Sequence, residues 1–339
     1  MAELDRGPEL DWALQLEAAT RRLAGVIRPT PVRGHQQLSE QLGTSVVCKD
    51  EGAQITGSFK IRGAYNALAG LEESVTEGGV ITYSSGNFGK ALAHAAARRA
   101  TQCVVVASSA TPEEKRQGIE AEGAELVLHD PLADRTRLTS RLAGERELAF
   151  ISPYDHAMVI AGQATAAREL LHDVPNLDAV IAPVSGGGLL AGCALAAHAA
   201  GGGTRVFGVE SAAVPRMSVS LHMGRRENVA GRATLADALR VTRPGEVAFP
   251  IISSLVEDVV TVNDAELLAA MELLRRLLGV RCEPSGAAGI AALLARRLPA
   301  ELRHVGVILS GSNIASARFE KLLRHNRQTP EAHATSYQQ

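Results

Sequence analysis

The sequence predicts an α/β fold with mostly parallel sheets, because short β-rich runs alternate with longer segments of helical periodicity. The expected strands are "SVVCK" at 45–49, "GVITY" at 79–83, "CVVVAS" at 103–108, "AELVLH" at 124–129, "DAVIAPV" at 178–184, "RVFGVE" at 205–210 and "VGVILS" at 305–310. Each run precedes a turn and a helical stretch, which is the pattern of βαβ units. A chain of 339 residues is long enough for two domains or for one large α/β unit with a sizeable core.

Capping signals mark the start of two helices. "TPEE" at 111–114 offers Thr111 as the N-cap, Pro112 at the first helical position and Glu114 to close a capping box. "NDAE" at 263–266 begins "LLAAMELLRRLLG" in a similar way, and Gly279 is the expected C-terminal stop. We find no repeat at a fixed period, and we expect the polar tail at 326–339 to be disordered.

Composition excludes several classes of partner. Thirty-five Lys and Arg against 37 Asp and Glu give a net charge of −2, and no basic stripe is interleaved with aromatics, so we expect no nucleic-acid partner. The N-terminal "MAELDRGPELDW" lacks the features of a signal peptide, and no apolar run is long enough to cross a bilayer. The cysteines are far apart with apolar neighbours, which indicates buried reduced thiols in a cytoplasmic protein: Cys48, Cys103, Cys193 and Cys282.

The first of four chemically unusual strand-to-turn junctions is "TGSFKIRGAYNAL" at 56–68. It places Lys60 between a turn of small residues and an amphipathic helix. Such a lysine is either a solvated surface group or a shielded amine that forms a Schiff base with a carbonyl cofactor. Phe59 beside it is either a core residue or a cover for a flat ring.

The other three junctions point to anions and to a ligand at the sheet edge. "SSGNFG" at 84–89 opens a helix and favours a carboxylate or phosphate, although its residues are also ordinary turn formers. "VSGGGLLAG" at 184–192 is either an amide-lined phosphate cup or a flexible connection, and it lacks the dinucleotide and Walker patterns. Ser310 in "LSGSN" ends a buried strand at the edge where ligands of open α/β sheets bind; alternatively, Ser312 or Asn313 caps a helix.

Taken together, a lysine amine, a glycine-amide cup, a second anion loop and a neutral hydroxyl are what pyridoxal phosphate requires. The chain resembles the fold-type II pyridoxal-phosphate enzymes, and within them the serine/threonine dehydratase and serine racemase group, over nearly its whole length to about residue 325. The matched stretches, in the family's order, are "TGSFKIRGA", "SSGNFGKALA", "PYDHAMVIAGQAT", "PVSGGGLLAG", "FGVE", "EPSGAAG" and "LSGSN".

The resemblance implies a fold like that of the tryptophan synthase β-subunit: two open, twisted, mostly parallel sheets with flanking helices, and the cofactor in the cleft between two domains. The larger, cofactor-binding domain would comprise residues 1–77 and 158–325, and the smaller, substrate-side domain residues 78–157. We expect a homodimer, and a chain of this length leaves no room for a separate effector-binding domain.

The resemblance also implies a role for each site residue. Lys60 would form the Schiff base with pyridoxal phosphate and then move protons at the substrate Cα. Phe59 and Ala238 would pack on the two faces of the ring, Asn87 would bond its 3′-oxygen and Ser310 would meet its pyridine nitrogen. The residues implied to wrap the cofactor phosphate are Ser185, Gly186, Gly187, Gly188 and Leu189, and those implied to hold the substrate carboxylate are Ser84, Ser85 and Gly86.

The implied activity is β-elimination from a β-hydroxy amino acid such as L-threonine or L-serine, giving a 2-oxo acid and ammonia. Because the hydroxyl of Ser310 need not protonate the ring nitrogen, the ring is a weaker electron sink, and loss of a β-hydroxyl suits the site better than transamination. Ser85 matches the second acid/base of serine racemases, so racemisation is an alternative, while simple carboxylate binding remains open for this residue. A ligand-binding regulatory relative without catalysis is the non-enzymatic alternative.

Three positions bear on substrate and metal, and two of them, Phe88 and Arg216, depart from the family pattern. Phe88 stands where many relatives have histidine, and Arg135 is the closest match to an arginine that some relatives present to a side-chain carboxylate. These two residues leave 3-hydroxyaspartate, or a bulkier 3-hydroxy amino acid, as alternative substrates; Arg135 can equally be a surface arginine. Some relatives hold a divalent cation through positions matching Glu210, Val214 and Arg216, and because a guanidinium has no lone pair to offer, we predict no metal in this chain.

Overall fold

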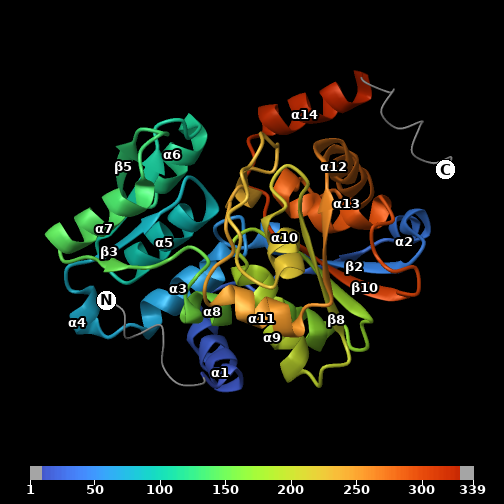
Figure 1. Ribbon diagram of the computed structural model, residues 1–339, viewed down its shortest axis with the longest axis horizontal. Coiled ribbons are helices and arrows are strands. Elements are labelled where there is room, and N and C mark those ends of the chain that lie inside the picture. Colours follow the sequence, from blue (N-terminus) through green and yellow to red (C-terminus); the bar gives the residue numbers. More distant parts are fainter. Residues whose placement is uncertain (1–9, 329–339) are drawn as a thin grey trace.

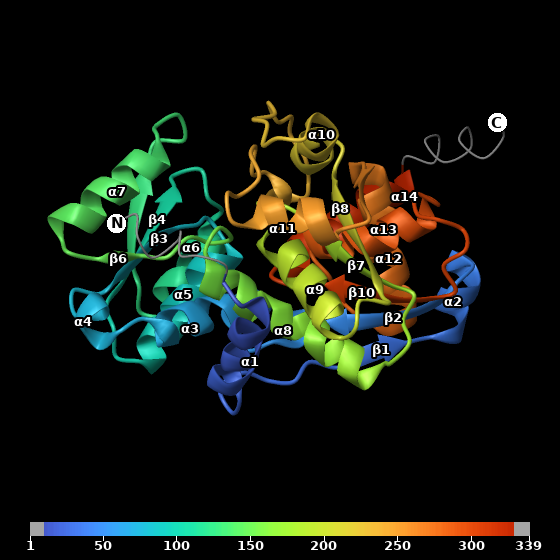
Figure 2. The ribbon, with the colours of Figure 1, turned by 60° about the horizontal axis from the view of Figure 1, so that its bottom comes forward.

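The computed structural model describes residues 10–328, with side chains up to residue 324, and contains two sheets. The larger has six strands in the order β1-β2-β10-β7-β8-β9, and the smaller has four in the order β5-β4-β3-β6. Among the strands within residues 10–328, β1 and β2 form the one antiparallel pair. The two sheets lie side by side with helices between and around them (Figures 1 and 2), which confirms the predicted fold class.

The six-stranded sheet is covered on both faces, so its central strands are continuously apolar. Its strands are β1 (Val32–Gly34), β2 (Ser45–Asp50), β7 (Ala179–Pro183), β8 (Arg205–Ser211), β9 (Asp258–Val262) and β10 (His304–Leu309). One face packs on α2 (Gln36–Leu42), α12 (Asp264–Leu278), α13 (Ala288–Leu294) and α14 (Ser316–Gln328). The other packs on α1 (Trp12–Leu23), α8 (Ala157–Asp173), α9 (Gly188–Ala199), α10 (Arg216–Met223) and α11 (Ala248–Leu255). Neighbouring residues of β7 alternate between these two cores, as the pleat of a strand requires.

The four-stranded sheet has a smaller core on each face. Its strands are β3 (Val80–Tyr83), β4 (Cys103–Ser108), β5 (Glu125–His129) and β6 (Ala149–Phe150). One face packs on α3 (Lys60–Gly70), α5 (Asn87–Arg98) and α6 (Glu113–Glu120), and the other on α7 (Arg135–Glu145). The short elements are α4 (Glu73–Thr76), η1 (Glu51–Ala53), η2 (Asp237–Leu239) and η3 (Pro284–Ala287). Helix α3 also packs on α8, so it joins the two units (Figure 1).

All seven predicted strands are present, and the three that sequence reasoning missed are short or lie at a sheet edge: β1, β6 and β9. The capping box of Asn263 with Glu266 and the left-handed stop at Gly279 are confirmed. Thr111 is not an N-cap: α6 begins at Glu113 after Pro112, and no side chain caps it. Residue 112 is extended, with φ −52° and ψ 141°, so the helix starts too late for the Thr111 hydroxyl to reach its amides.

The predicted buried thiols are confirmed, since all four cysteines are free and buried. No helix within residues 10–328 is both long enough and apolar enough to span a membrane. The tail expected to be disordered begins within α14, whose backbone is helical to Gln328. The remainder of that tail, at 329–339, and the N-terminal residues 1–9 lie outside the described residues.

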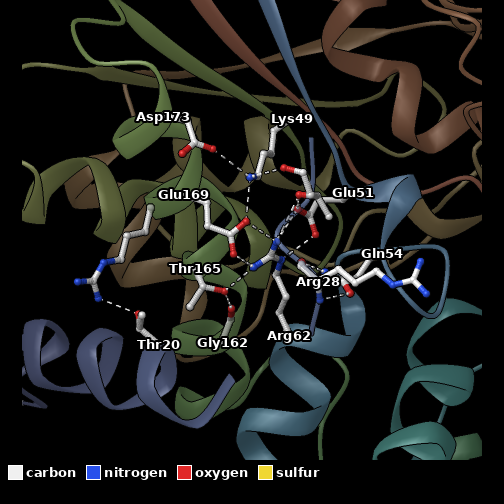
Figure 3. Close-up of polar contacts among 12 residues, drawn as sticks. Thr20, Arg28, Lys49, Glu51, Gln54, Arg62, Gly162, Thr165, Glu169 and Asp173 are labelled. Carbon is white, nitrogen blue, oxygen red and sulfur yellow. Dashed lines mark hydrogen bonds and ion pairs between the residues drawn. The ribbon is translucent and has the colours of Figure 1, made fainter. Parts of the chain in front are cut away.

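A cluster of buried charges holds α3 in place (Figure 3). Arg62 is fully buried in the first turn of α3 and makes two hydrogen bonds to Glu51, at 2.7 and 2.8 Å, and two to Glu169, at 2.6 and 2.8 Å. Lys49, also fully buried, lies 2.8 Å from Glu169 and 3.7 Å from Asp173. The cluster ties β2 and η1 to α3 and α8, and thereby fixes the start of α3, where Lys60 lies.

We expect Arg62→Met to lower the free energy of unfolding by about 3–5 kcal/mol, because it leaves the carboxylate of Glu51 buried without its cation. Urea denaturation followed by circular dichroism measures the change. Arg205→Met is the control: Arg205 pairs with Glu257 and Glu301 at the surface, where water compensates for a lost ion pair, so the shift should be much smaller. Equal midpoints for Arg62→Met and the wild type would show that the cluster does not stabilise the fold.

Candidate active site

Every site residue predicted from the sequence lines one cavity of about 370 Å³. The cavity has walls from both sheet units, since β3, α5, α6 and α7 contribute on one side and β7, α9, η2, η3 and Ser310, directly after β10, on the other. Its size is typical of a small-molecule site. The structure therefore brings the four junctions together, while the role of each residue stays a prediction.

The turn before Lys60 is anchored to the end of β10. Gly57 has φ +76°, which favours glycine, and its carbonyl accepts a hydrogen bond from the amide of Ser312 at 2.9 Å. Ser58 pairs with Gly311, and the amide of Phe59 donates to the carbonyl of Ser310 at 3.1 Å. The strand end that carries Ser310 and the helix start that carries Lys60 are thus held next to each other.

Lys60 directs its amine into the cavity rather than into solvent. Its Nζ donates to the carbonyl of Pro153 at 2.9 Å and lies 4.9 Å from the ring centroid of Phe59 and 5.7 Å from that of Phe88. Burial lowers the pKa of Lys60 to about 8, and the nearby Glu283 opposes this shift only in part. An amine with this pKa is partly neutral near physiological pH, which makes it a nucleophile and a base.

The loop at 185–189, which links β7 to α9 and includes the first two residues of that helix, is shaped for an anion. Gly187 has φ +110°, and a Cβ on Gly186 would lie 2.1 Å from the ring of Tyr154, so neither position accepts an ordinary side chain. The first amides of α9 have no acceptor in their own helix and lie at its positive end. The hydroxyl oxygen of Ser185 is buried and has no hydrogen-bond partner in the described chain. An unpartnered hydroxyl beside free helix amides fits a phosphate group.

The second anion loop, Ser84–Gly86, connects β3 to α5. The hydroxyl of Ser84 accepts from the amide of Gly86 at 3.2 Å, and that of Ser85 accepts from the amide of Ser108 at 3.4 Å. The amine of Lys115 lies 3.9 Å from where a Cβ of Gly86 would be. The loop thus combines the positive end of a 12-residue helix with a nearby cation, which suits a carboxylate.

Asn87, the first residue of α5, is clamped from both sides. Its amide nitrogen donates to Glu283 at 2.7 Å, and its oxygen accepts from Asn313 at 2.8 Å. The alternative that Ser312 or Asn313 caps the last helix is therefore wrong: Asn313 bonds to Asn87 and to the carbonyl of Thr56, Ser312 donates to the carbonyl of Gly52, and α14 begins only at Ser316.

Three further predicted residues, Ser310, Ala238 and Phe88, line the cavity. Ser310 is 5% exposed at the end of β10, and Ala238 lies in η2, with its amide donating to Ser285 at 3.2 Å. Phe88 is 2% exposed and packs in the core of the four-stranded sheet, so it forms a cavity wall rather than a free side chain.

Arg135 lies at the rim of the cavity and is exposed. It is the first residue of α7, and its guanidinium lies 4.8 Å from the ring centroid of Tyr83, which in turn stacks on Phe150 at 5.6 Å. It is therefore a surface arginine at a helix start and also a residue of the site.

Sequence reasoning missed four charged residues of the cavity: Lys115, Asp237, Arg240 and Glu283. Glu283 is buried, and desolvation, followed by repulsion from Asp237, raises its pKa to about 7. Lys115 on α6 and Asp237 on η2 form an ion pair of 2.5 Å that joins the two units across the cavity. Glu283 could have been predicted, because it belongs to the matched stretch "EPSGAAG". Nothing in the local sequence indicates the contact between Lys115 and Asp237.

No three His, Cys, Asp or Glu side chains within the described part of the chain are grouped so as to hold a metal ion. The absence of a metal from this protein stays a prediction.

Comparison with known proteins gives three consistent results. The family described as "Pyridoxal-phosphate dependent enzyme" matches residues 23–311. L-threo-3-hydroxyaspartate ammonia-lyase of Saccharomyces cerevisiae is 36% identical over 313 residues, covering 92% of this chain and 96% of the relative. L-threonine ammonia-lyase of Thermotoga maritima is 33% identical over 309 residues, covering 91% and 77%. The crystal structure of serine racemase from Dictyostelium discoideum superposes with a TM-score of 0.84 at 36% identity, covering 89% of this chain and 98% of that one.

These matches extend over both sheets and all four junctions of the cavity. The chain belongs to the pyridoxal-phosphate-dependent enzymes of fold type II.

Proposed function

We propose that this protein is an ammonia-lyase that removes the β-hydroxyl of a β-hydroxy amino acid and yields a 2-oxo acid and ammonia. One observation carries the proposal: a lysine amine of lowered pKa shares a cavity with two separate anion loops. One loop suits the cofactor phosphate and the other a substrate carboxylate. The ammonia-lyases among the relatives support the same reaction class.

The cofactor would be held by residues already in place. Lys60 would anchor it, Ser185 and the amides of residues 186–189 would bind its phosphate, and Ser310 would meet its ring nitrogen. Bound pyridoxal phosphate supplies the electron sink for the electron pair left at the substrate Cα. Asn87 would bond the cofactor's 3′-oxygen from a fixed orientation, because Glu283 and Asn313 hold the two ends of its side-chain amide.

The chain's own residues then move the proton and orient the substrate. Ser84, Ser85 and Gly86 bind the α-carboxylate, which turns the Cα–H bond toward Lys60. The neutral amine of Lys60 removes that proton and becomes an ammonium. The Cα electron pair then forms the Cα–Cβ double bond as the Cβ–O bond breaks, and the ammonium of Lys60 returns the proton to the hydroxyl, which leaves as water. The unsaturated amino acid that is released hydrolyses to the 2-oxo acid and ammonia.

A second candidate substrate is 3-hydroxyaspartate, and Arg135 is the observation that favours it. Its guanidinium lines the rim of the cavity and is held over the ring of Tyr83. A guanidinium can bind a second carboxylate through two parallel hydrogen bonds. The yeast relative, named for L-threo-3-hydroxyaspartate, supports this choice over L-serine and L-threonine.

We also propose the domain organisation and the setting of the protein. Residues 1–77 with 158–325 and residues 78–157 form two domains around the two sheets, and the protein acts as a homodimer in the cytoplasm. The separate cores of the two sheets support two units, and α3, which packs in the core of the four-stranded sheet and also on α8, lies at their boundary. Four buried free thiols support a reducing compartment.

We expect Lys60→Ala to abolish the visible absorption of bound cofactor and to lower 2-oxo acid formation from L-serine, L-threonine and 3-hydroxyaspartate by roughly 10²–10⁴-fold or more, because the general base is lost. Lys321→Ala on α14, outside this cavity, is the matched control and should behave as wild type. A wild-type protein that takes up no pyridoxal phosphate, and behaves the same as Lys60→Ala, would exclude the enzyme.

We expect Arg135→Met to lower kcat/KM for 3-hydroxyaspartate about 10- to 150-fold relative to L-serine, because a charge-assisted hydrogen bond contributes about 1.5–3 kcal/mol. Steady-state assays with both substrates give the ratio. Arg137→Met, an exposed arginine of the same helix outside the cavity, is the control. An equal fall for both substrates would show that Arg135 does not recognise the second carboxylate.

The rate of cofactor uptake by the apoprotein should rise with pH through about 8. The pKa of Lys60 is lowered from 10.5 to about 8, so the charged amine dominates below this pH and the reactive neutral amine above it. Stopped-flow absorbance after mixing with pyridoxal phosphate measures the midpoint. A midpoint near 10.5 would mean that burial does not activate the amine.

A further inference from the structure

Arg216 is a fully buried cation directly behind the phosphate-type loop. Its Nε donates to the carbonyl of Ser185 at 3.1 Å, and one Nη donates to that of Val184. The other Nη donates to the carbonyls of Val214, at 2.8 Å, and Leu239, at 3.2 Å. Four main-chain carbonyls from three separate segments thus converge on one guanidinium.

The charge of Arg216 is balanced by a single carboxylate. Glu210, also fully buried, lies 3.3 Å from the guanidinium and accepts hydrogen bonds from the amides of Met217 and Ser218, both at 2.9 Å, at the start of α10. Burial lowers the pKa of Arg216 to about 10, and attraction to Glu210 opposes this. The side chain remains a cation at neutral pH.

The contacts of Arg216 set which way the loop's amides point. In a trans peptide the C=O and the following N–H point in opposite directions. Because the carbonyls of Val184 and Ser185 face Arg216, the amides of Ser185 and Gly186 face away from it, and both residues line the cavity. The carbonyl of Gly186 is held in turn by the amide of Gly245 at 2.9 Å. Contacts on the side of the loop away from the cavity therefore determine how its amides are arranged toward the cavity.

The side chain of Arg216 also contacts η2, which forms another part of the cavity wall. Leu239, whose carbonyl it binds, follows Ala238 in η2, and both residues line the cavity. One guanidinium therefore fixes the loop at 185–189 relative to the residue expected against the ring.

A divalent cation does not fit this position. Such an ion needs several oxygen ligands, preferably carboxylates, and the guanidinium already contacts the carboxylate of Glu210 and the carbonyl of Val214. Arg216 itself offers no lone pair. The metal site that the family resemblance implies for some relatives is in this chain filled by a side chain.

We propose that Arg216 is a built-in cation that shapes the cofactor-binding loop and makes cofactor affinity independent of divalent metal. Arg216 is a positioning residue, because it touches neither substrate nor cofactor and acts through the carbonyls of the loop. The inference rests on the proposed function only in taking the loop at 185–189 as the phosphate site.

The first test measures the dissociation constant of pyridoxal phosphate by absorbance titration of apoprotein. We expect Arg216→Met to bind at least about tenfold more weakly than wild type, and Arg216→Lys, which keeps the charge but has fewer donors, to be intermediate. Met271→Ala in the core of α12 is the control, since it should lower the melting temperature and leave the cofactor affinity within about twofold. Wild-type affinity in Arg216→Met would overturn the proposal.

The second test concerns metal and uses the wild type, so it does not depend on a variant folding. Cofactor affinity should be the same in EDTA, in Mg²⁺ and in Ca²⁺, and a loss of affinity in EDTA would overturn the proposal. Arg216→Asp returns a second carboxylate next to Glu210, so Mg²⁺ or Ca²⁺ should restore its affinity while leaving Arg216→Met unchanged. No recovery, or equal recovery in both variants, would contradict a cation position here. Because the readout is binding, a protein that binds cofactor but makes no 2-oxo acid would refute the proposed function alone.

Discussion

The site depends on one constraint, which is that Lys60 must stay at the junction of the two sheet units. Lys60 begins α3, and Arg62, two residues further along, holds this helix in place. The guanidinium of Arg62 bonds both to Glu51 in η1, directly after β2, and to Glu169 on α8 (Figure 3). A buried ion cluster of this kind is weak evidence for stability, since its desolvation offsets much of its attraction. The cluster matters here for geometry. Its paired hydrogen bonds fix the position of α3 along its axis and its rotation about that axis, and α3 carries Lys60.

Arg216 holds the loop at 185–189 in position, as Arg62 holds the helix that carries Lys60. Both guanidinium groups are fully buried, and both act on the site from outside it, one through carboxylates and the other mainly through main-chain carbonyls. A preorganised site requires supporting groups that lock its first layer of residues. In this fold Arg62 positions the amine of Lys60, and Arg216 positions the loop at 185–189. Neither arginine lines the cavity, so its volume remains available to a ligand.

The sequence predicted the strands and the members of the site well, and their mutual contacts poorly. The carboxyl ends of parallel strands meet at one edge, so motifs that follow strands converge without any knowledge of distances. The pair of Lys115 with Asp237, 122 residues apart, has no local pattern, and neither does the set of carbonyls around Arg216. The wrong prediction of Thr111 as an N-cap has another cause. Pro112 is extended, so α6 begins one residue later than predicted, and the sequence pattern of a cap does not distinguish these two start positions.

The charges at the cavity rim bear on which substrate fits. Three cations besides Lys60 line the cavity. Lys115 is already paired with Asp237 at 2.5 Å, so its charge is largely compensated, and the guanidinium of Arg240 donates to the carbonyl of Thr234 at 2.6 Å. Arg135 lies on the uncharged ring of Tyr83, and no carboxylate among the described residues pairs with it. A substrate with one carboxylate would leave this guanidinium to solvent, whereas a second carboxylate would meet a cation already held in position by the ring. An unpaired cation at the rim is therefore consistent with the proposed substrate 3-hydroxyaspartate, which has a second carboxylate to bind it, whereas L-serine has none.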